Sequence, residues 1–221
     1  KKHIDYFIEK EVDAIVIVCV DSYGLREQVE KASTAGIKII AYDRLITEAG
    51  VDLYISFDNS MVGSMMGEAF VQNGVTDTNV LMLGGSPTDS NVPLVEDAFK
   101  KVMEENNNTI LDSFHADNWE AELAAQYVYD NMDVVAQADA IMCGNDNLAS
   151  QVVRALAEKR LAGDILVSGQ DADLEACQRI VEGTQLMTVY KPVEKLAQRA
   201  AECTVQLILE DTVTGGDVET I

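Results

Sequence analysis

Short apolar runs alternate along the chain with longer segments in which apolar residues recur every three or four positions. The longer segments predict amphipathic helices. The short runs are rich in β-branched residues and continuously apolar, which is typical of strands that a parallel sheet buries on both faces. Seven runs predict strands: residues 13–20, 37–42, 79–83, 110–115, 138–143, 165–168 and 186–190. Regular alternation of strands and helices predicts an α/β fold built on doubly wound parallel sheets.

The alternation is broken once, in residues 54–59. This segment is strand-like, yet a short polar loop rather than a helix separates it from the strand before it. We interpret the break as a connection between two sheets, so that the chain forms two lobes. The expected division places residues 1–57 and 192–215 in the first lobe and residues 58–191 and 216–221 in the second.

The charge balance excludes several classes of partner. Sixteen Lys and Arg residues stand against 38 Asp and Glu residues, a formal net charge of −22. Such a chain repels phosphate backbones and anionic lipid, so no nucleic-acid partner is expected. No apolar run approaches the ~20 residues that span a bilayer, so no direct membrane insertion is expected either. With 48% hydrophobic residues, the chain is not a disordered acidic tail.

The residues that carry metal and acid–base chemistry are sparse. Four cysteines are scattered without a Cys-x-x-Cys pair, and His3 and His115 lie far apart, which predicts no metal site and no cofactor. The chain also lacks a nucleophile motif, a phosphate-binding glycine loop and an obvious acid–base pair. We therefore expect recognition without turnover, and no enzyme activity.

Polar groups follow six of the predicted strands, at the edge where open α/β sheets bind their ligands. Carboxylates accept protons from hydroxyl groups, Arg and Lys donate, and amides do both. An indole can cover an apolar C–H face, and this combination suits a sugar. The candidate binding residues are Asp43, Arg44, Asn91, Trp119, Asn145, Asp171 and Lys191.

Each of these residues also has a structural interpretation. Polar residues are common at strand ends because loops are solvated. Asn145, Ser86 and Asp89 each precede a predicted helix that they would cap, and Trp119 would pack at the start of a helix. The agreement of six strand ends favours ligand binding over these separate explanations.

Several motifs together resemble the sugar-binding proteins of bacterial ABC importers, which have the type I periplasmic binding protein fold. They are Tyr42-Asp43-Arg44, residues 54–59, Gly84-Gly85-Ser86-Pro87, Asn145-Asp146, Gln170-Asp171-Ala172-Asp173 and residues 183–192. The resemblance implies two Rossmann-like lobes joined by a three-segment hinge, with the sugar held between them. It also implies that the first lobe lacks the N-terminal strand–helix units of the family, which would leave residues 13–20 as an exposed edge.

The resemblance implies a role for each candidate residue. Asp43 and Arg44 would contact the sugar from the first lobe, and Lys191 would donate from the hinge. Asp89 would support the loop that bears Asn91. The contacts implied for the second lobe are Asn91, Trp119, Asn145 and Asp171, and the hinge residues are Asp58, Asn59 and Pro192.

The function implied is that of an extracytoplasmic receptor in the periplasm or at the cell surface. It would bind D-xylose or another aldopentose and deliver it to the permease of an ABC importer; a lipid anchor in a segment outside this chain is left open. One alternative is a sensing domain that presents the sugar to a membrane sensor kinase or chemoreceptor. A second is the effector domain of a transcriptional repressor of the lactose-repressor type. The chain alone is expected to bind sugar weakly or not at all.

Overall fold

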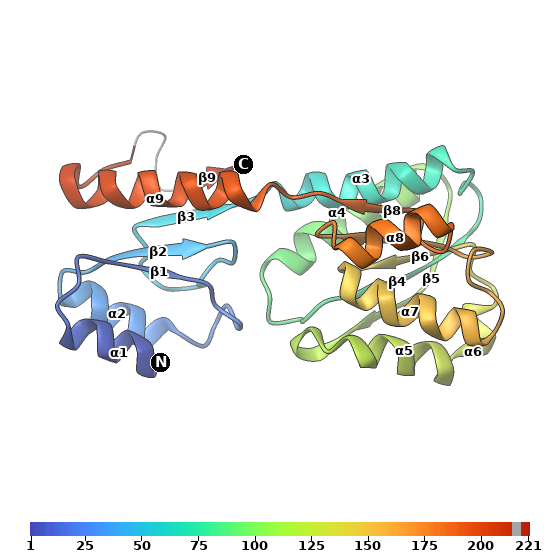
Figure 1. Cartoon of the computed structure of the whole chain (residues 1–221), viewed down its shortest axis with the longest axis horizontal. Helices are drawn as coiled ribbons and strands as arrows, with labels where there is room; N and C mark the ends of the chain where they lie inside the picture. The colour runs from blue at the N-terminus through green and yellow to red at the C-terminus, as the bar shows by residue number, and fades with distance from the viewer. Residues whose placement is uncertain (214–217) are drawn as a thin grey trace. The chain divides into compact units, whose positions relative to one another are not determined.

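The computed structural model describes residues 1–213 and 218–221, which divide into two compact units (Figure 1). The first unit comprises Lys1–Asp58, Thr88–Asn91 and Pro192–Ile221. The second comprises Asn59–Pro87 and Val92–Lys191. The chain passes from the first unit to the second after Asp58, returns briefly for Thr88–Asn91, and returns finally after Lys191.

The first unit is a parallel sheet with helices on both faces. Its strands, in the order β1-β2-β3-β9, are β1 (Ala14–Ile17), β2 (Lys38–Tyr42), β3 (Leu53–Ser56) and β9 (Val218–Thr220). Helices α1 (Lys2–Glu9) and α2 (Arg26–Thr34) cover one face, and α9 (Val193–Glu210) covers the other (Figure 1). Alternate residues of β2 therefore enter different cores: Ile39 packs with α1 and α2, and Ile40 packs with α9.

The second unit is a five-stranded parallel sheet in the order β5-β4-β6-β7-β8. Its strands are β4 (Asn79–Gly84), β5 (Thr109–His115), β6 (Ala140–Cys143), β7 (Leu166–Gln170) and β8 (Met187–Val189). Its helices are α3 (Asn59–Gln72), α4 (Asn91–Glu105), α5 (Ala121–Asp130), α6 (Met132–Val135), α7 (Asp146–Glu158) and α8 (Leu174–Glu182), with a 3-10 turn, η1 (Asp117–Trp119). Side chains of α3 and α4 pack on one face of the sheet and those of α5, α6 and α7 on the other.

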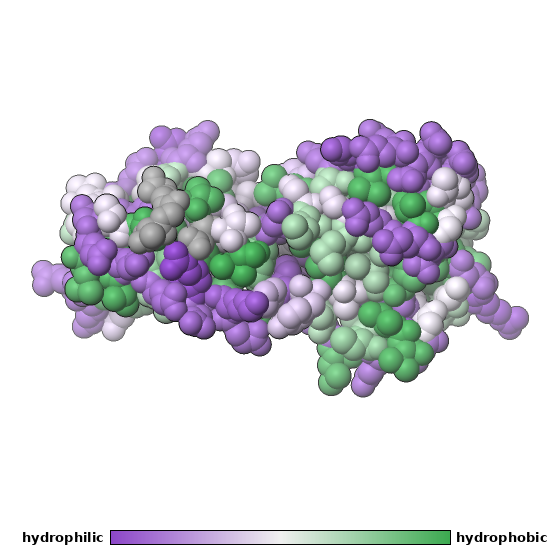
Figure 2. All heavy atoms as spheres, turned by 90° about the horizontal axis from the view of Figure 1, so that it is seen from above, coloured by the Kyte–Doolittle hydropathy of each residue, from purple (hydrophilic) through white to green (hydrophobic). Residues whose placement is uncertain are grey.

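These layers confirm the predicted α/β fold with parallel sheets in two groups. Central strands such as β4 and β6 are buried on both faces, as continuous apolarity indicated. Hydrophilic residues cover much of the surface seen in Figure 2, consistent with the net charge of −22. None of the helices in the described part of the chain has the length and apolarity to cross a membrane.

The C-terminal segment differs from the expectation. Residues 216–221 were expected in the second lobe, but β9 pairs with β3 in the first sheet, with Tyr54 opposite Val218 and Ser56 opposite Thr220. The Ile221 N–H also donates to the Ser56 carbonyl (3.0 Å). The pairing gives the otherwise open edge of β3 its hydrogen bonds. Residues 214–217, to which both expected ranges extend, lie outside the described residues.

Strand β1 also differs, because one of its faces is buried and the other is covered only at Ala14. Ile15, Ile17 and Cys19 are buried, whereas Val16 is 48% and Val18 60% exposed. Helix α9 packs on β2 and β3, and among the described residues β1 has β2 as its only neighbouring strand. An open strand edge with apolar side chains is a site for pairing with another chain.

We therefore expect that Val16→Lys lowers self-association of this chain, because a charge on an exposed edge strand opposes edge-to-edge pairing. Sedimentation velocity at micromolar to millimolar concentrations measures this. Val181→Lys is the matched control, since Val181 is 89% exposed and lies on helix α8 rather than on a strand. Equal self-association of the two variants would contradict the role of the edge.

The cysteines should differ sharply in reactivity. Cys19, Cys143 and Cys203 are buried, whereas Cys177 is exposed. Burial raises the pKa of the Cys19 and Cys143 thiols, which lowers the fraction of reactive thiolate at pH 8. A thiol reagent should label Cys177 rapidly in the folded protein and all four cysteines in urea. Rapid labelling of a second thiol in the folded protein would contradict the packing.

Candidate functional site

In the first unit, Asp43 lies where β2 ends, with its backbone held from several sides. Its φ of 64° is in the left-handed region, which is uncommon for a residue other than glycine. Its N–H donates to the Ile55 carbonyl (2.8 Å), and its carbonyl accepts from Ser56 Oγ (2.7 Å) and Asn91 Nδ2 (3.0 Å). These bonds fix the backbone of Asp43 and therefore the position from which its side chain extends.

Arg44 forms a buried ion pair with Asp89. Arg44 Nε lies 2.7 Å from Asp89 Oδ2, and the Asp89 side chain is only 1% exposed. Asp89 Oδ1 also accepts from the Asn91 N–H (3.0 Å), and Arg44 Nη1 donates to the Cys19 carbonyl (3.3 Å). Because a buried carboxylate needs both a counter-charge and donors, Asp89 ties residues 88–91 to the end of β2.

Asn91 belongs to the first unit and not, as expected, to the second lobe. Besides its bond to Asp43, its Oδ1 accepts from Tyr54 Oη (3.3 Å). The expectation followed the order of the chain, in which Asn91 comes after β4 and begins α4. Hydrogen bonds between segments far apart in sequence decide its place instead.

In the second unit, Trp119 packs against glycine backbone. It follows β5 in η1, where Asn118 (φ 53°) and Trp119 (φ 61°) are consecutive left-handed residues. A Cβ atom at Gly85 would overlap three carbons of the indole ring, and one at Gly144 would lie 3.2 Å from it. Trp119 therefore does pack at the helix start, on the ends of β4 and β6.

Asn145 caps α7, as its structural interpretation proposed. Its Oδ1 accepts from the Leu148 N–H (2.9 Å), and among the described residues its Nδ2 donates to no partner. A cap of this kind uses the oxygen and leaves the amide nitrogen available for another acceptor. Capping and ligand contact are therefore compatible at Asn145.

Asp171 is not a helix cap. It follows β7 with φ 103°, and its Oδ1 lies 2.9 Å from Lys191 Nζ; the two side chains are 38% and 17% exposed. Helix α8 begins later, with Asp173 at its N-cap position and no side-chain capping bond. The Asp173 N–H is bound instead by Asp146 Oδ2 (3.0 Å).

Asp146 and Glu96 are buried carboxylates that the sequence interpretation missed. Burial raises the pKa of Asp146, against the lowering effect of hydrogen bonds from Gln185, Thr188 and the Asp173 N–H. Glu96 lies on α4, and its two carboxylate oxygens lie 3.0 and 3.1 Å from His115 Nε2. The sequence did hold a signal for each buried carboxylate. Glu96 is an acidic residue in an otherwise apolar stripe of a helix, and Asp146 is an acidic residue shortly after a strand.

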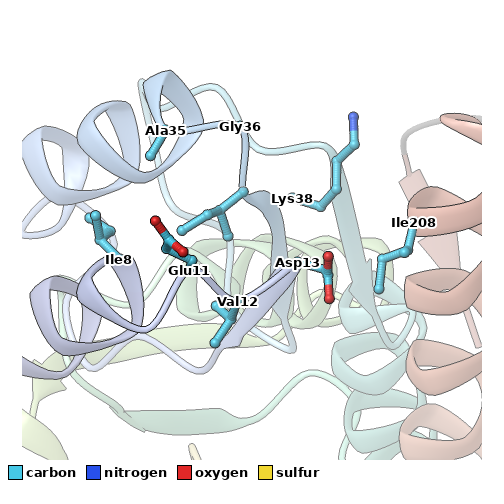
Figure 3. A pocket seen from close by; sticks show the side chains of 9 residues that line it. Ile8, Glu11, Val12, Asp13, Ala35, Gly36, Lys38 and Ile208 are labelled. Atoms are coloured by element: carbon cyan, nitrogen blue, oxygen red, sulfur yellow. The ribbon is translucent and has the colours of Figure 1, made fainter.

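The residues described here show no cluster of three or more His, Cys, Asp or Glu side chains that could hold a metal ion. Two hollows lie in the first unit, and the first of them has no candidate binding residue in its lining. One, of about 540 Å³, is at the amino ends of β1 and β2, where Ile8, Val12 and Ile208 form walls near Asp13 and Lys38 (Figure 3). The other, of about 510 Å³, runs along the open edge of β1.

Gly85→Ala should displace the indole of Trp119, because the new Cβ would overlap the ring. Overpacking of this kind costs about 1–3 kcal/mol. Trp119 is the only tryptophan of the chain, so its fluorescence emission reports the displacement directly. Gly50→Ala is the control, since a Cβ there meets nothing within 4 Å. An emission spectrum of Gly85→Ala identical to that of the unaltered protein would contradict the contact.

Comparison with known proteins identifies the family. Residues 1–211 match the periplasmic binding protein domain. The chain is 38% identical over 209 residues to the D-xylose-binding periplasmic protein of Haemophilus influenzae and 37% identical over 209 residues to that of Escherichia coli; each match covers 92% of this chain and 63% of the relative. The chain thus spans less than two thirds of the length of these relatives.

A solved structure agrees with these relatives. The periplasmic solute-binding protein of an ABC transporter from Actinobacillus succinogenes, with bound D-allose, superposes with a TM-score of 0.87 at 27% identity, over 100% of this chain and 78% of the other. The chain belongs to the periplasmic binding protein family, a family of solute-binding domains rather than enzymes.

Proposed function

We propose that this chain is part of an extracytoplasmic receptor that binds an aldopentose, D-xylose first, and delivers it to an ABC importer. The observation that carries the proposal is the set of ionic and amide groups at the carboxyl ends of the strands in both units. Ligands of open α/β sheets bind at that edge. The proposal rests further on the two D-xylose-binding relatives at 37–38% identity.

In the first unit the proposed sugar contacts are Asp43, Arg44 and Asn91. The ion pair with Asp89 holds the guanidinium of Arg44 in place, and a guanidinium is a planar group of N–H donors suited to hydroxyl oxygens. Asp43 contributes a carboxylate acceptor at the end of β2. Fixed donors and acceptors of this kind select hydroxyl groups by position, because an unmatched buried polar group is costly.

In the second unit the proposed contacts are Trp119, Asn145, Asp171 and Lys191. The indole would cover the C–H face of the sugar, and the Asn145 amide would donate to a hydroxyl oxygen. Asp171 would accept two hydroxyl protons, with its charge balanced by Lys191. None of these groups is an activated nucleophile, so the sugar would leave unchanged.

A hinge and a membrane partner complete the proposed receptor. Asp58, Asn59 and Pro192 stand where the chain passes between the two units, and we assign them to the hinge. The location proposed is the periplasm or the cell surface, with the permease of the importer as partner. A sensor kinase or chemoreceptor would use the same binding chemistry, and binding of the sugar-loaded protein to isolated permease separates these partners.

Asp171→Ala should weaken D-xylose binding more than Trp119→Ala. Hydrogen bonds to a charged group contribute about 1.5–3 kcal/mol each, so two of them outweigh the roughly 1–3 kcal/mol from covering the apolar face. Asp171→Asn should lose less, because it keeps one acceptor oxygen. Calorimetric titration of the complete gene product measures all three variants, and the unaltered protein is titrated against pentoses, hexoses and amino acids.

Asp173→Ala is the matched control, since Asp173 is an exposed carboxylate two residues away that caps nothing with its side chain. It should bind as the unaltered protein does. Melting curves show whether each variant remains folded. Unchanged affinity of Asp171→Ala would overturn the assignment of Asp171, and tightest binding to an amino acid would overturn the sugar.

A further inference from the structure

The carboxylate of Asp146 is buried at the start of α7, where three other segments meet. The residue is 1% exposed. Its Oδ2 accepts from the Asp173 N–H (3.0 Å) and from Thr188 Oγ1 (2.8 Å), and its Oδ1 accepts from Gln185 Nε2 (2.9 Å). One side chain thus joins the beginning of α7 to the turn after β7, to β8 and to the segment before β8.

The turn after β7 is strained and held by hydrogen bonds at each amide. Asp171 (φ 103°) and Ala172 (φ 56°) are consecutive left-handed residues, and neither is a glycine. Residues other than glycine in this region are strained and persist only where the surroundings hold them. The Asp171 N–H donates to the Val189 carbonyl (2.9 Å), the Ala172 N–H to Thr188 Oγ1 (3.1 Å), and the Asp173 N–H to Asp146.

Two of these three bonds depend on Asp146. It accepts the Asp173 N–H directly, and it also accepts the hydroxyl proton of Thr188, which orients the Thr188 oxygen toward the Ala172 N–H. Removal of the carboxylate therefore releases the turn on the side that leads into α8. The carboxylate of Asp171, which lies 2.9 Å from Lys191, would then lose its fixed position.

The neighbours of Asp146 indicate that the sequence makes room for it. A Cβ atom at Gly169 would overlap Asp146 Oδ1, so glycine is required in β7 at that point. Arg179, on α8, donates from Nη2 to the Asp146 carbonyl (3.1 Å) and from Nε to Gln185 Oε1 (2.9 Å). Gln185 is thereby oriented with its amide nitrogen toward Asp146.

We propose that Asp146 is a positioning residue for ligand recognition: it touches no ligand itself but holds the strained Asp171–Asp173 turn that places Asp171 against Lys191. The inference rests on the proposed function for its ligand, but its structural part stands without it. A carboxylate in the first turn of a helix also interacts with the helix dipole, and that role alone would affect stability without affecting the turn.

The experiment compares Asp146→Ala and Asp146→Asn in the complete gene product, with Asn108→Ala as control. Asn108 is also a buried polar residue of the second unit, but it binds Thr78 and Val75 near the start of β4, away from the turn. Amide hydrogen exchange reports the local opening of individual N–H groups. D-xylose titration reports the effect on binding.

We expect the Ala172 and Asp173 amides to exchange at least roughly tenfold faster in Asp146→Ala than in Asn108→Ala. The two variants are compared under conditions in which their melting temperatures are equal. Tenfold is the factor expected from loss of a hydrogen bond to a charged group. Asp146→Asn should fall between, because one oxygen can still accept from the turn. Asp146→Asn also tests the proposal if Asp146→Ala fails to fold. Unchanged exchange at both amides in Asp146→Asn and Asp146→Ala would overturn the proposal.

A double-mutant cycle with Asp171→Ala tests whether Asp146 acts through Asp171. In the Asp171→Ala background, Asp146→Asn should weaken D-xylose binding by less than twofold, although in the unaltered background it weakens binding severalfold. Equal loss in both backgrounds would overturn the positioning role. If Asp171→Ala itself leaves the affinity unchanged, the proposed sugar site fails, and the exchange rates still decide whether Asp146 holds the turn.

Discussion

Parallel strand pairing determines where polar groups can stand in this structure. Every strand pair in both sheets is parallel, so the loops that leave the carboxyl ends of the strands gather at one edge of each sheet. The central strands are buried on both faces and can carry few polar groups. Polar chemistry is therefore concentrated at strand ends, where Asp43, Asn145 and Asp171 stand.

Glycines let large side chains reach these strand ends. At Gly84, Gly85 and Gly169 a Cβ atom would overlap, in turn, the Glu96 carboxylate, the Trp119 indole and the Asp146 carboxylate. A glycine gives up side-chain packing in a strand, but here the space is filled by a residue from another element. Because these three positions lack a side chain, two buried carboxylates and the single tryptophan can lie against the ends of β4 and β7.

Continuous apolarity was enough to predict the fold, because burial on both faces leaves that pattern in the sequence. It was misleading for β1, whose apolar residues are alternately buried and exposed. It also failed for β9, a three-residue strand whose place depends on the open edge of β3. Short edge strands owe their position to the partner strand, and no local pattern records that partner.

The candidate site was predictable as far as it follows strand ends. What could not be predicted was which polar groups pair with each other. Asp89 with Arg44 and Glu96 with His115 are joined across 45 and 19 positions of the chain. Asp146 stands directly beside the predicted Asn145, yet its partners come from residues 173, 185 and 188. Such contacts arise from packing, which a single sequence does not display.

We propose that a sugar is recognised at the carboxyl ends of the strands. An NMR titration of the isotope-labelled complete gene product with D-xylose tests it most directly. The amides whose signals shift should lie at the ends of β2, β6 and β7 and around Trp119. Shifts confined to the hollow at the amino ends of β1 and β2, around Glu11 and Lys38, or no shift at saturating D-xylose, would contradict it.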